Sequence, residues 1–346
     1  MKLNRILYFG YYLKKLNRPL LETFSQHVKK ESGRGRLSQW LSLTRDSFRY
    51  NISILEYYQF RFFEKEAKEK NDWAGTGYMY EYQLKMNPPA ERIILDDKTK
   101  FYRAYKDFFV HKVSDLKDLR NDPSMAEQLL NSKAGKLVFK VGDGKCGADV
   151  DIRKTDEFTP QSLIRFLEES QYDLVEEFIQ QHEELQKLAP TAVNTIRIFT
   201  QLNSENKVEL LGCRLRISVN SNVDNMAAGN LAAPIDDKTG VVSGPGVYSD
   251  ITKAEQKHHP VTGVAIEGFQ VPFWSEIIEM VKKAHKMHPQ NRSIGWDVVV
   301  TDKGPGLIEG NHDWCKLLWQ LPAQQGLKSR LLEYDMITSQ KELQHA

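Results

Sequence analysis

The segment from Ser293 to Cys315 constrains the fold of this chain more than any other. Its residues Trp296 to Thr301 alternate with the period of two that is typical of a β-strand. Asp302 to Gly306 is dense in turn-forming residues, and an apolar run resumes at Leu307. This pattern predicts a hairpin of two antiparallel strands.

Three oxygen-bearing side chains lie on this hairpin. Asp297 is near the start of the first strand, and Glu309 and Asn311 are two residues apart at the end of the second. Pairing about the turn would bring Asp297 close to Glu309, and side chains two apart in a strand share a face. A carboxylate beside buried aliphatic residues needs a partner, and hard oxygen donors suit Mg²⁺. We therefore predict a magnesium site; the alternative is a hairpin with solvated acids, as we expect for Asp302.

A second predicted hairpin contains a glycine-rich turn. Strands are predicted at residues 136–141 and 148–153, and Gly142, Gly144 and Gly147 between them spell G-x-G-x-x-G. A dinucleotide-binding motif must open a helix, so this context excludes that class of site. A glycine-rich turn between antiparallel strands can instead close its backbone N–H groups over nucleotide phosphates, with Lys140 supplying a positive charge. The alternative is an exposed hairpin with a solvated lysine.

The remaining pattern predicts a helical N-terminal part followed by mixed strands and helices. Apolar spacings of three and four occur through residues 1 to about 90, and Asn87 to Ala90 breaks the pattern. Beyond it we expect a short strand at 93–95, a helix at 99–109 capped by Asp97, a helix at 159–170, strands at 172–179, 193–202 and 208–219, and a helix at 272–288. His285 and His288, at the basic end of that last helix, are expected to face water.

Composition narrows the class of protein. The 346 residues are 40% hydrophobic and 27% charged, as in an ordinary soluble globular protein, and a net charge of +2 gives no reason to expect nucleic acid as a partner. Cys146, Cys213 and Cys315 form no CxxC pair, which argues against a disulfide framework or zinc site and favours the cytoplasm. We find no signal peptide and no apolar run of about 18 residues. No Ser-His-Asp or Cys-His arrangement suggests nucleophilic catalysis.

The first 36 residues are strongly basic. They contain nine lysines and arginines against Glu22 and Glu31: Lys2, Arg5, Lys14, Lys15, Arg18, Lys29, Lys30, Arg34 and Arg36. Such a stripe either is simply solvated or makes a peripheral contact with an anionic membrane surface or a lipid-linked glycan phosphate. In the second case the protein would work at the inner face of the membrane.

The order of these features resembles a known superfamily. Lys98 opens a helix, Lys140 leads into the glycine-rich turn, a strand ends in Val175–Ile179, Arg197 follows on a strand, and the acidic hairpin comes last. This order resembles the ATP-grasp superfamily of carboxylate-amine ligases. Three sequence segments resemble more narrowly the sugar-transfer-associated ATP-grasp proteins of bacterial polysaccharide gene clusters: NTIRIFT, NMAAGN and IGWDVVVTDKGPGLIEGN. The resemblance covers roughly residues 90 to 325.

The resemblance implies an α+β, ATP-grasp fold, in which two α+β subdomains clasp ATP. It implies a helical region at 1–90, an ATP-grasp domain at 91–330 and a tail at 331–346. Within the domain, the lid subdomain would cover about 110–175 and the core subdomain about 176–330. The sequence departs from the family pattern at Gly295, where an arginine is usual, and at residues 312–314.

The resemblance also implies roles for individual residues. Lys98, Lys140 and the glycines Gly142, Gly144 and Gly147 would hold the phosphates of ATP; Glu176, Glu177, Phe178 and Ile179 would bind the adenine; Asp297, Glu309 and Asn311 would bind Mg²⁺, with Mn²⁺ as an alternative. Arg197, together with Arg216 or Arg214, would stabilise the transferring phosphate or bind the acid substrate.

The reaction implied is ATP- and Mg²⁺-dependent joining of a carboxylate to an amine through an acyl phosphate. Small-molecule or saccharide substrates of bacterial surface polysaccharide biosynthesis are implied by the family context alone. Two alternatives remain open: a kinase that transfers only phosphate, and a nucleotide-regulated binding module without turnover.

Overall fold

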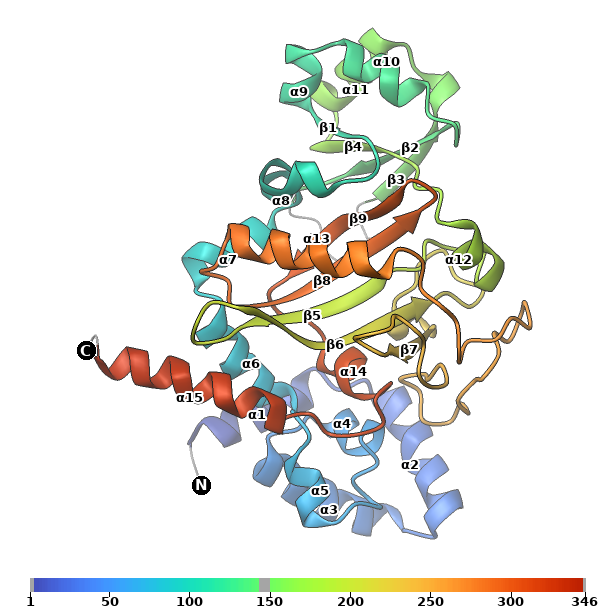
Figure 1. Cartoon of the computed structure of the whole chain (residues 1–346). Helices are drawn as coiled ribbons and strands as arrows, with labels where there is room; N and C mark the ends of the chain where they lie inside the picture. The colour runs from blue at the N-terminus through green and yellow to red at the C-terminus, as the bar shows by residue number, and fades with distance from the viewer. Residues whose placement is uncertain (1–2, 143–149, 345–346) are drawn as a thin grey trace.

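The computed structural model describes residues 3–142 and 150–344, and its N-terminal part is helical, as predicted. The helices of this part are α1 (Leu3–Lys14), α2 (Arg18–Ser32), α3 (Arg36–Tyr50), α4 (Ile54–Gln59), α5 (Ala67–Asn71) and α6 (Thr76–Met86). Phe60 and Phe62 are buried among these helices together with Phe24 and Leu43. Figure 1 shows this helical part at one end of the molecule.

A small antiparallel sheet lies at the opposite end (Figure 1). Its strands are β1 (Val113–Asp115), β2 (Lys136–Lys140), β3 (Val150–Lys154) and β4 (Leu174–Glu177), in the order β1-β4-β2-β3. Three helices pack with Leu137, Phe139 and Val175: α9 (Leu116–Asn121), α10 (Ser124–Leu130) and α11 (Pro160–Glu169). Because these inward residues alternate with the others, the opposite face of the sheet is left for Lys140 and Glu176.

A larger antiparallel sheet forms the middle of the molecule. Its strands are β7 (Leu231–Ile235), β6 (Val208–Ile217), β5 (Ile196–Leu202), β8 (Ser293–Thr301) and β9 (Gly304–Asn311), in the order β7-β6-β5-β8-β9. Helix α13 (Trp274–Met287) covers one face, where Ile198, Trp296 and Val298 are buried. On the other face Phe199 packs with α6, α14 (Lys316–Gln320) and α15 (Ser329–Gln344).

Short helices connect these layers. They are α7 (Pro89–Asp96), α8 (Lys98–Tyr105), α12 (Glu183–Leu188) and the single 3₁₀ turns η1 (Lys106–Phe108), η2 (Thr155–Glu157) and η3 (Met226–Ala228). The prediction of a strand at residues 93–95 is wrong. Pro89 begins a helix there, and the helix buries Leu95 while Ile93 stays exposed, which is the one-sided pattern of an amphipathic helix.

The expectation that His285 faces water is also wrong. Its ring is buried under α13, with Nδ1 2.7 Å from the Thr200 Oγ1 and Nε2 2.9 Å from the Asn291 carbonyl oxygen. Burial lowers the pKa of His285 to about 4, so the ring is a neutral packing element. No helix among the described residues has the length and apolar run that crossing a bilayer requires.

Candidate functional site

The two predicted carboxylates face each other on the central sheet. β8 and β9 pair antiparallel with Asp297 opposite Glu309 and Gly295 opposite Asn311, and the register shifts directly after Asp297. The expectation that Asp297 and Glu309 lie near one another is therefore confirmed. Since Trp296 and Val298 point to the α13 face, Asp297 points to the opposite face.

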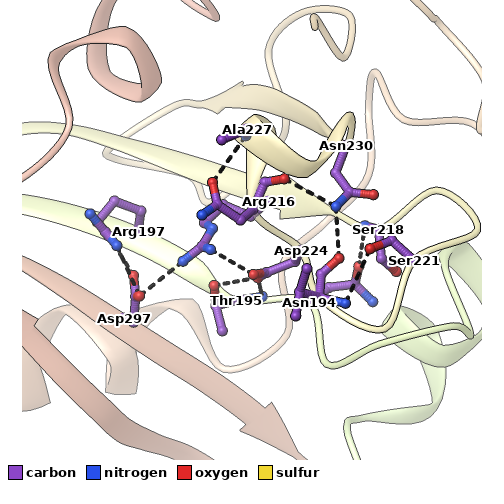
Figure 2. Close-up of polar contacts among 12 residues, drawn as sticks. Asn194, Thr195, Arg197, Arg216, Ser218, Ser221, Asp224, Ala227, Asn230 and Asp297 are labelled. Carbon is purple, nitrogen blue, oxygen red and sulfur yellow. Dashed lines mark hydrogen bonds and ion pairs between the residues drawn. The ribbon is translucent and has the colours of Figure 1, made fainter. Parts of the chain in front are cut away.

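Two arginines hold Asp297. Arg197 is its direct neighbour on β5, and its guanidinium makes two bonds to the carboxylate, one of them 2.9 Å from Nη2 to Oδ2. Arg216 on β6 donates from Nη1 to the same Oδ2 at 2.9 Å (Figure 2). Burial alone would raise the pKa of Asp297, but the two guanidinium groups hold it well below its usual range. Asp297 is thus kept as a carboxylate inside the protein.

Arg216 is itself clamped from the other side. Its Nη2 lies 2.7 Å from the Asp224 Oδ1, and Asp224 in turn accepts from the backbone N–H of Thr195 at 2.8 Å and from its hydroxyl at 2.5 Å. Figure 2 shows the resulting chain of ion pairs and hydrogen bonds from Arg197 through Asp297, Arg216 and Asp224 to Thr195. Sequence reasoning missed Asp224, since it lies in an irregular segment and only the folded sheet brings it to Arg216.

Glu309 has the opposite electrostatic environment. Burial and the neighbouring Asp297 raise its pKa, although Arg197 partly opposes this, and the Asn311 amide donates to its Oε1 at 3.2 Å. A divalent cation beside the two carboxylates would remove the cost of this second buried charge, so the donors fit Mg²⁺. Within residues 3–142 and 150–344, no cluster of three or more His, Cys, Asp or Glu side chains is suited to a metal. The predicted third ligand of such an ion would be the side-chain oxygen of Asn311.

Arg214 and Arg216 have different roles. The sequence left open whether Arg214 or Arg216 acts together with Arg197. In the structure Arg214 donates to the backbone oxygens of Trp319 and Cys213, the latter at 2.7 Å. Burial lowers the pKa of Arg214 to about 10. Only Arg216 joins Arg197 at the carboxylate.

Gly295, where the family pattern has arginine, is explained by packing. A Cβ atom at this position would lie 2.6 Å from the Cβ of Trp314 and 3.4 Å from the Cδ of Arg197. The indole of Trp314 and the side chain of Arg197 therefore occupy the space over Gly295. A guanidinium still reaches Asp297, but it comes from the neighbouring strand.

A second charged cluster lies on the small sheet. Lys140 Nζ is 2.7 Å from the Glu176 Oε2, and the same oxygen is 3.2 Å from His111 Nε2. Burial alone would raise the pKa of Glu176, but Lys140 and His111 lower it to about 2. Sequence reasoning missed His111; its Nδ1 is buried without a hydrogen-bond partner in the described structure.

The open face of the small sheet has an apolar part. Register places Val150 opposite Lys140, and Val138 opposite both Ile152 and Glu176, so these side chains share one face. Val150 and Ile152 are exposed. A flat apolar group could stack on them beside the charged cluster.

The end of β4 and the two residues after it are half-buried. The N–H of Glu177 donates to the Lys112 carbonyl oxygen at 2.9 Å, and the N–H of Phe178 to that of Lys136 at 3.1 Å. These two N–H groups are therefore engaged by the sheet. A ligand at this edge would meet the carbonyl groups and the backbone of Ile179.

The N-terminus of α8 docks on the start of the glycine-rich turn. The backbone N–H of Lys98 donates to the Gly142 carbonyl oxygen at 2.8 Å, and its Nζ lies 3.3 Å from the Val141 oxygen. Asp97 caps the helix, as predicted, by accepting from the N–H groups of Thr99 and Lys100. The structure thus brings Lys98 to the base of the turn that Lys140 precedes. Gly144 and Gly147 lie outside the described residues.

Comparison with known proteins gives one family. The model of the "Sugar-transfer associated ATP-grasp" family matches residues 78–335. A search of curated proteins finds no match.

The solved structures that match are distant in sequence, and this chain spans less than two thirds of the length of the first of them. The ATP-grasp ligase PsnB, complexed with a minimal precursor, has a TM-score of 0.42 at 12% identity, over 73% of this chain and 63% of that chain. D-alanine–D-alanine ligase from Bacillus anthracis has a TM-score of 0.39 at 15% identity, over 73% of this chain and 70% of that chain. N5-carboxyaminoimidazole synthetase from Staphylococcus aureus, complexed with ADP, has a TM-score of 0.39 at 9% identity, over 67% of this chain and 52% of that chain.

Proposed function

Since the chain belongs to the sugar-transfer associated ATP-grasp family, we propose that it is an ATP- and Mg²⁺-dependent ligase that joins a carboxylate to an amine. The observation that carries the proposal is the pair of facing carboxylates, Asp297 and Glu309, with Arg197 and Arg216 on the same side of the sheet. Such a site suits phosphoryl transfer, in which positioning and charge stabilisation do most of the catalysis.

The nucleotide would lie between the two sheets. Lys98, Lys140 and the backbone from Gly142 onward would hold its phosphates, because the first helix turn of α8 and the end of β2 meet there. The adenine would stack on the open apolar face of the small sheet, with its edge against the segment Glu176–Ile179. Lys140 would then exchange part of its contact with Glu176 for phosphate.

Mg²⁺, when bound by Asp297, Glu309 and Asn311, would neutralise phosphate charge. Arg197 and Arg216 fix the orientation of the Asp297 carboxylate before any ligand arrives, so little reorganisation is needed during the reaction. Their guanidinium groups would also face the transferring phosphoryl group. Mn²⁺ would fit the same oxygen donors.

The reaction would have two steps. An oxygen of the substrate carboxylate attacks the γ-phosphorus of ATP, and ADP leaves with the electron pair of the broken P–O bond. The amine then attacks the acyl carbon of the acyl phosphate, inorganic phosphate leaves, and the amine loses a proton. The family description names sugar transfer, which supports a saccharide or sugar-linked substrate. We propose that the reaction belongs to surface polysaccharide synthesis in the cytoplasm.

The test is ADP release by the full chain with a panel of uronic acids and amino acids, with and without hydroxylamine. We expect release that needs Mg²⁺ and an acid, a hydroxamate in the presence of hydroxylamine, and loss of turnover in Asp297→Asn and Glu309→Gln. A stable phosphorylated product that hydroxylamine leaves intact would make the protein a kinase. ATP binding without turnover on any pair would make it a binding module.

A further inference from the structure

Helix α1 exposes an apolar face. Four large side chains on it are turned to solvent, and Leu7 is 66% exposed: Ile6, Leu7, Tyr11 and Leu13. The opposite side of the helix carries the buried Tyr12, which joins the core of the helical region. A surface helix normally places polar residues on its outer face, whereas α1 has apolar residues on both sides.

Helix α3 exposes apolar side chains in the same way. Leu37 is 75% exposed and Leu41 is 66% exposed, and Trp40 lies between them on the same side of the helix. The opposite side buries Leu43 and Tyr50. Spacings of three and four residues make Leu37, Trp40 and Leu41 neighbours on one ridge.

Helices α1 and α3 pack against each other. The rings of Phe9 on α1 and Phe48 on α3 pack with centroids 4.8 Å apart, and the Tyr12 hydroxyl donates to the Asn51 side chain at 3.3 Å. We call the exposed set on the two helices the α1–α3 surface: Ile6, Leu7, Tyr11, Leu13, Leu37, Trp40 and Leu41. Isolated exposed apolar residues are ordinary, but a group of this size marks an interaction site.

A basic cavity borders this surface. It has a volume of about 320 Å³, and its lining includes Arg34, Arg45, Arg49, Lys65 and Lys70. Positions 41, 45 and 49 succeed one another at intervals of four, so Arg45 and Arg49 continue the ridge of Leu41 along α3.

The lining also has three acids, Asp46, Glu64 and Glu66, which are fewer than its five basic side chains. Asp46 accepts from both Arg45 and Lys70, and Glu64 is bound by Arg61. Among the described residues, neither Arg34 nor Arg49 forms an ion pair with a carboxylate. The cavity therefore keeps an excess of positive charge beside the apolar ridge.

We propose that the α1–α3 surface docks on an anionic lipid bilayer. Leucine, isoleucine and tryptophan side chains suit the boundary between headgroups and acyl chains, and arginines beside them suit the lipid phosphates. A second copy of this chain is a worse partner, because two such basic edges would repel. The inference does not depend on the ligase reaction, because it concerns only where the protein binds. The side chains that contact the membrane would come from α3 and not from the basic N-terminal stripe alone.

The test is co-sedimentation of the full chain with lipid vesicles. We expect binding to phosphatidylcholine vesicles containing about one third phosphatidylglycerol, and at least about tenfold weaker partitioning into pure phosphatidylcholine. Leu37→Ser/Leu41→Ser and Arg34→Ala/Arg49→Ala should each weaken partitioning about tenfold or more. Salt at about 0.5 M should weaken the wild type and have less effect on the arginine variant.

Matched controls remove the same chemistry at a distance. Val261→Ser/Met287→Ser removes two exposed apolar side chains, and Lys282→Ala/Lys283→Ala removes two exposed cations of α13; both should bind vesicles as the wild type does. ATP turnover in solution should be unchanged in all variants, which separates this inference from the proposed reaction.

Two results would overturn the proposal. One is equal vesicle binding by the wild type and the Leu37→Ser/Leu41→Ser variant. The other is a lipid-free wild type that sediments as a dimer which the same variant dissociates, because the surface would then join two copies of the chain.

Discussion

Glu309→Gln and Asp297→Asn should change the stability of the metal-free protein in opposite directions, although each removes a proposed metal ligand. Glutamine keeps the oxygen that accepts from Asn311 but removes one of two facing negative charges. Asparagine at 297 leaves Arg197 and Arg216 without the carboxylate that both contact. The contrast tests the electrostatics of the site independently of any substrate.

The magnitudes follow from the geometry. Opposite side chains on paired strands lie about 5 Å apart, and two unit charges at that distance repel by about 3 kcal/mol at an effective dielectric constant of about 20. Attraction to Arg197 offsets part of this for Glu309, so we expect Glu309→Gln to raise the free energy of unfolding by about 1 to 2 kcal/mol. Asp297→Asn breaks a buried ion pair and should lower it by about 3 to 5 kcal/mol.

The assay is urea unfolding at about pH 8, where Glu309 is most fully ionised, with a metal chelator and again with excess Mg²⁺. Wild type should gain stability from Mg²⁺, because an ion that binds only the folded state stabilises it, and both variants should gain less. Destabilisation by Glu309→Gln without metal, or an equal Mg²⁺ effect in all three proteins, would refute the reasoning.

Substitutions at Gly295 and Lys140 probe the supports of the site, with Gly10 as a control. Gly295→Ala should lower the free energy of unfolding by about 1 to 3 kcal/mol, because the new Cβ would lie 2.6 Å from the Cβ of Trp314. Gly10→Ala, where the new Cβ has nothing within 4 Å, should stabilise α1 by up to about 1 kcal/mol. Equal urea midpoints for the two variants would contradict this. Lys140→Met should weaken ATP binding at least about tenfold by calorimetry. Burial raises the pKa of Glu176, but Lys140 helps to lower it from the ordinary 4.5 to about 2, so the wild type loses stability as the pH falls from 4.5 toward 2. Lys140→Met should reduce this loss. An unchanged dependence of the urea midpoint on pH over this range would contradict the prediction.

Local patterns made part of the site predictable. Asp297 and Glu309 are joined by a short turn, so a period of two and the turn residues sufficed to place them opposite each other. Asp97 as a helix cap was predictable for the same reason, since a cap acts within three residues. Interactions that close within one hairpin or one helix turn can be inferred without knowing the rest of the fold.

The other partners depend on long-range pairing. Arg216 meets Asp297 only because β6, β5 and β8 are adjacent, and a register shift between Phe199 and Thr200 alters which side chains align. Asp224 reaches Arg216 from an irregular segment. No periodicity in the sequence specifies such a meeting, because strand order and bulges are decided by the packing of the whole sheet.

Burial misled the sequence reasoning at two places. His285 occurs among lysines that are exposed, yet its own position on α13 faces the sheet, where Thr200 and the Asn291 backbone satisfy both ring nitrogens. The run at 93–95 is too short to separate a strand from one helical turn by its apolar residues. The proline at 89 was the better guide, since it favours the first turn of a helix.

The helical region is built into the site rather than attached beside it. Buried Glu56 on α4 accepts from the Thr76 hydroxyl at 2.6 Å on α6 and from Lys316 at 3.0 Å on α14. Burial alone would raise the pKa of Glu56, but Lys316 and these hydrogen bonds lower it, so the ion pair persists at neutral pH. Helix α14 follows β9, which carries Glu309, and it packs through Leu317 into the same apolar cluster as α3. A bilayer bound by the α1–α3 surface would therefore hold strands β8 and β9 in a fixed orientation to the membrane, because the helical region packs directly against α14.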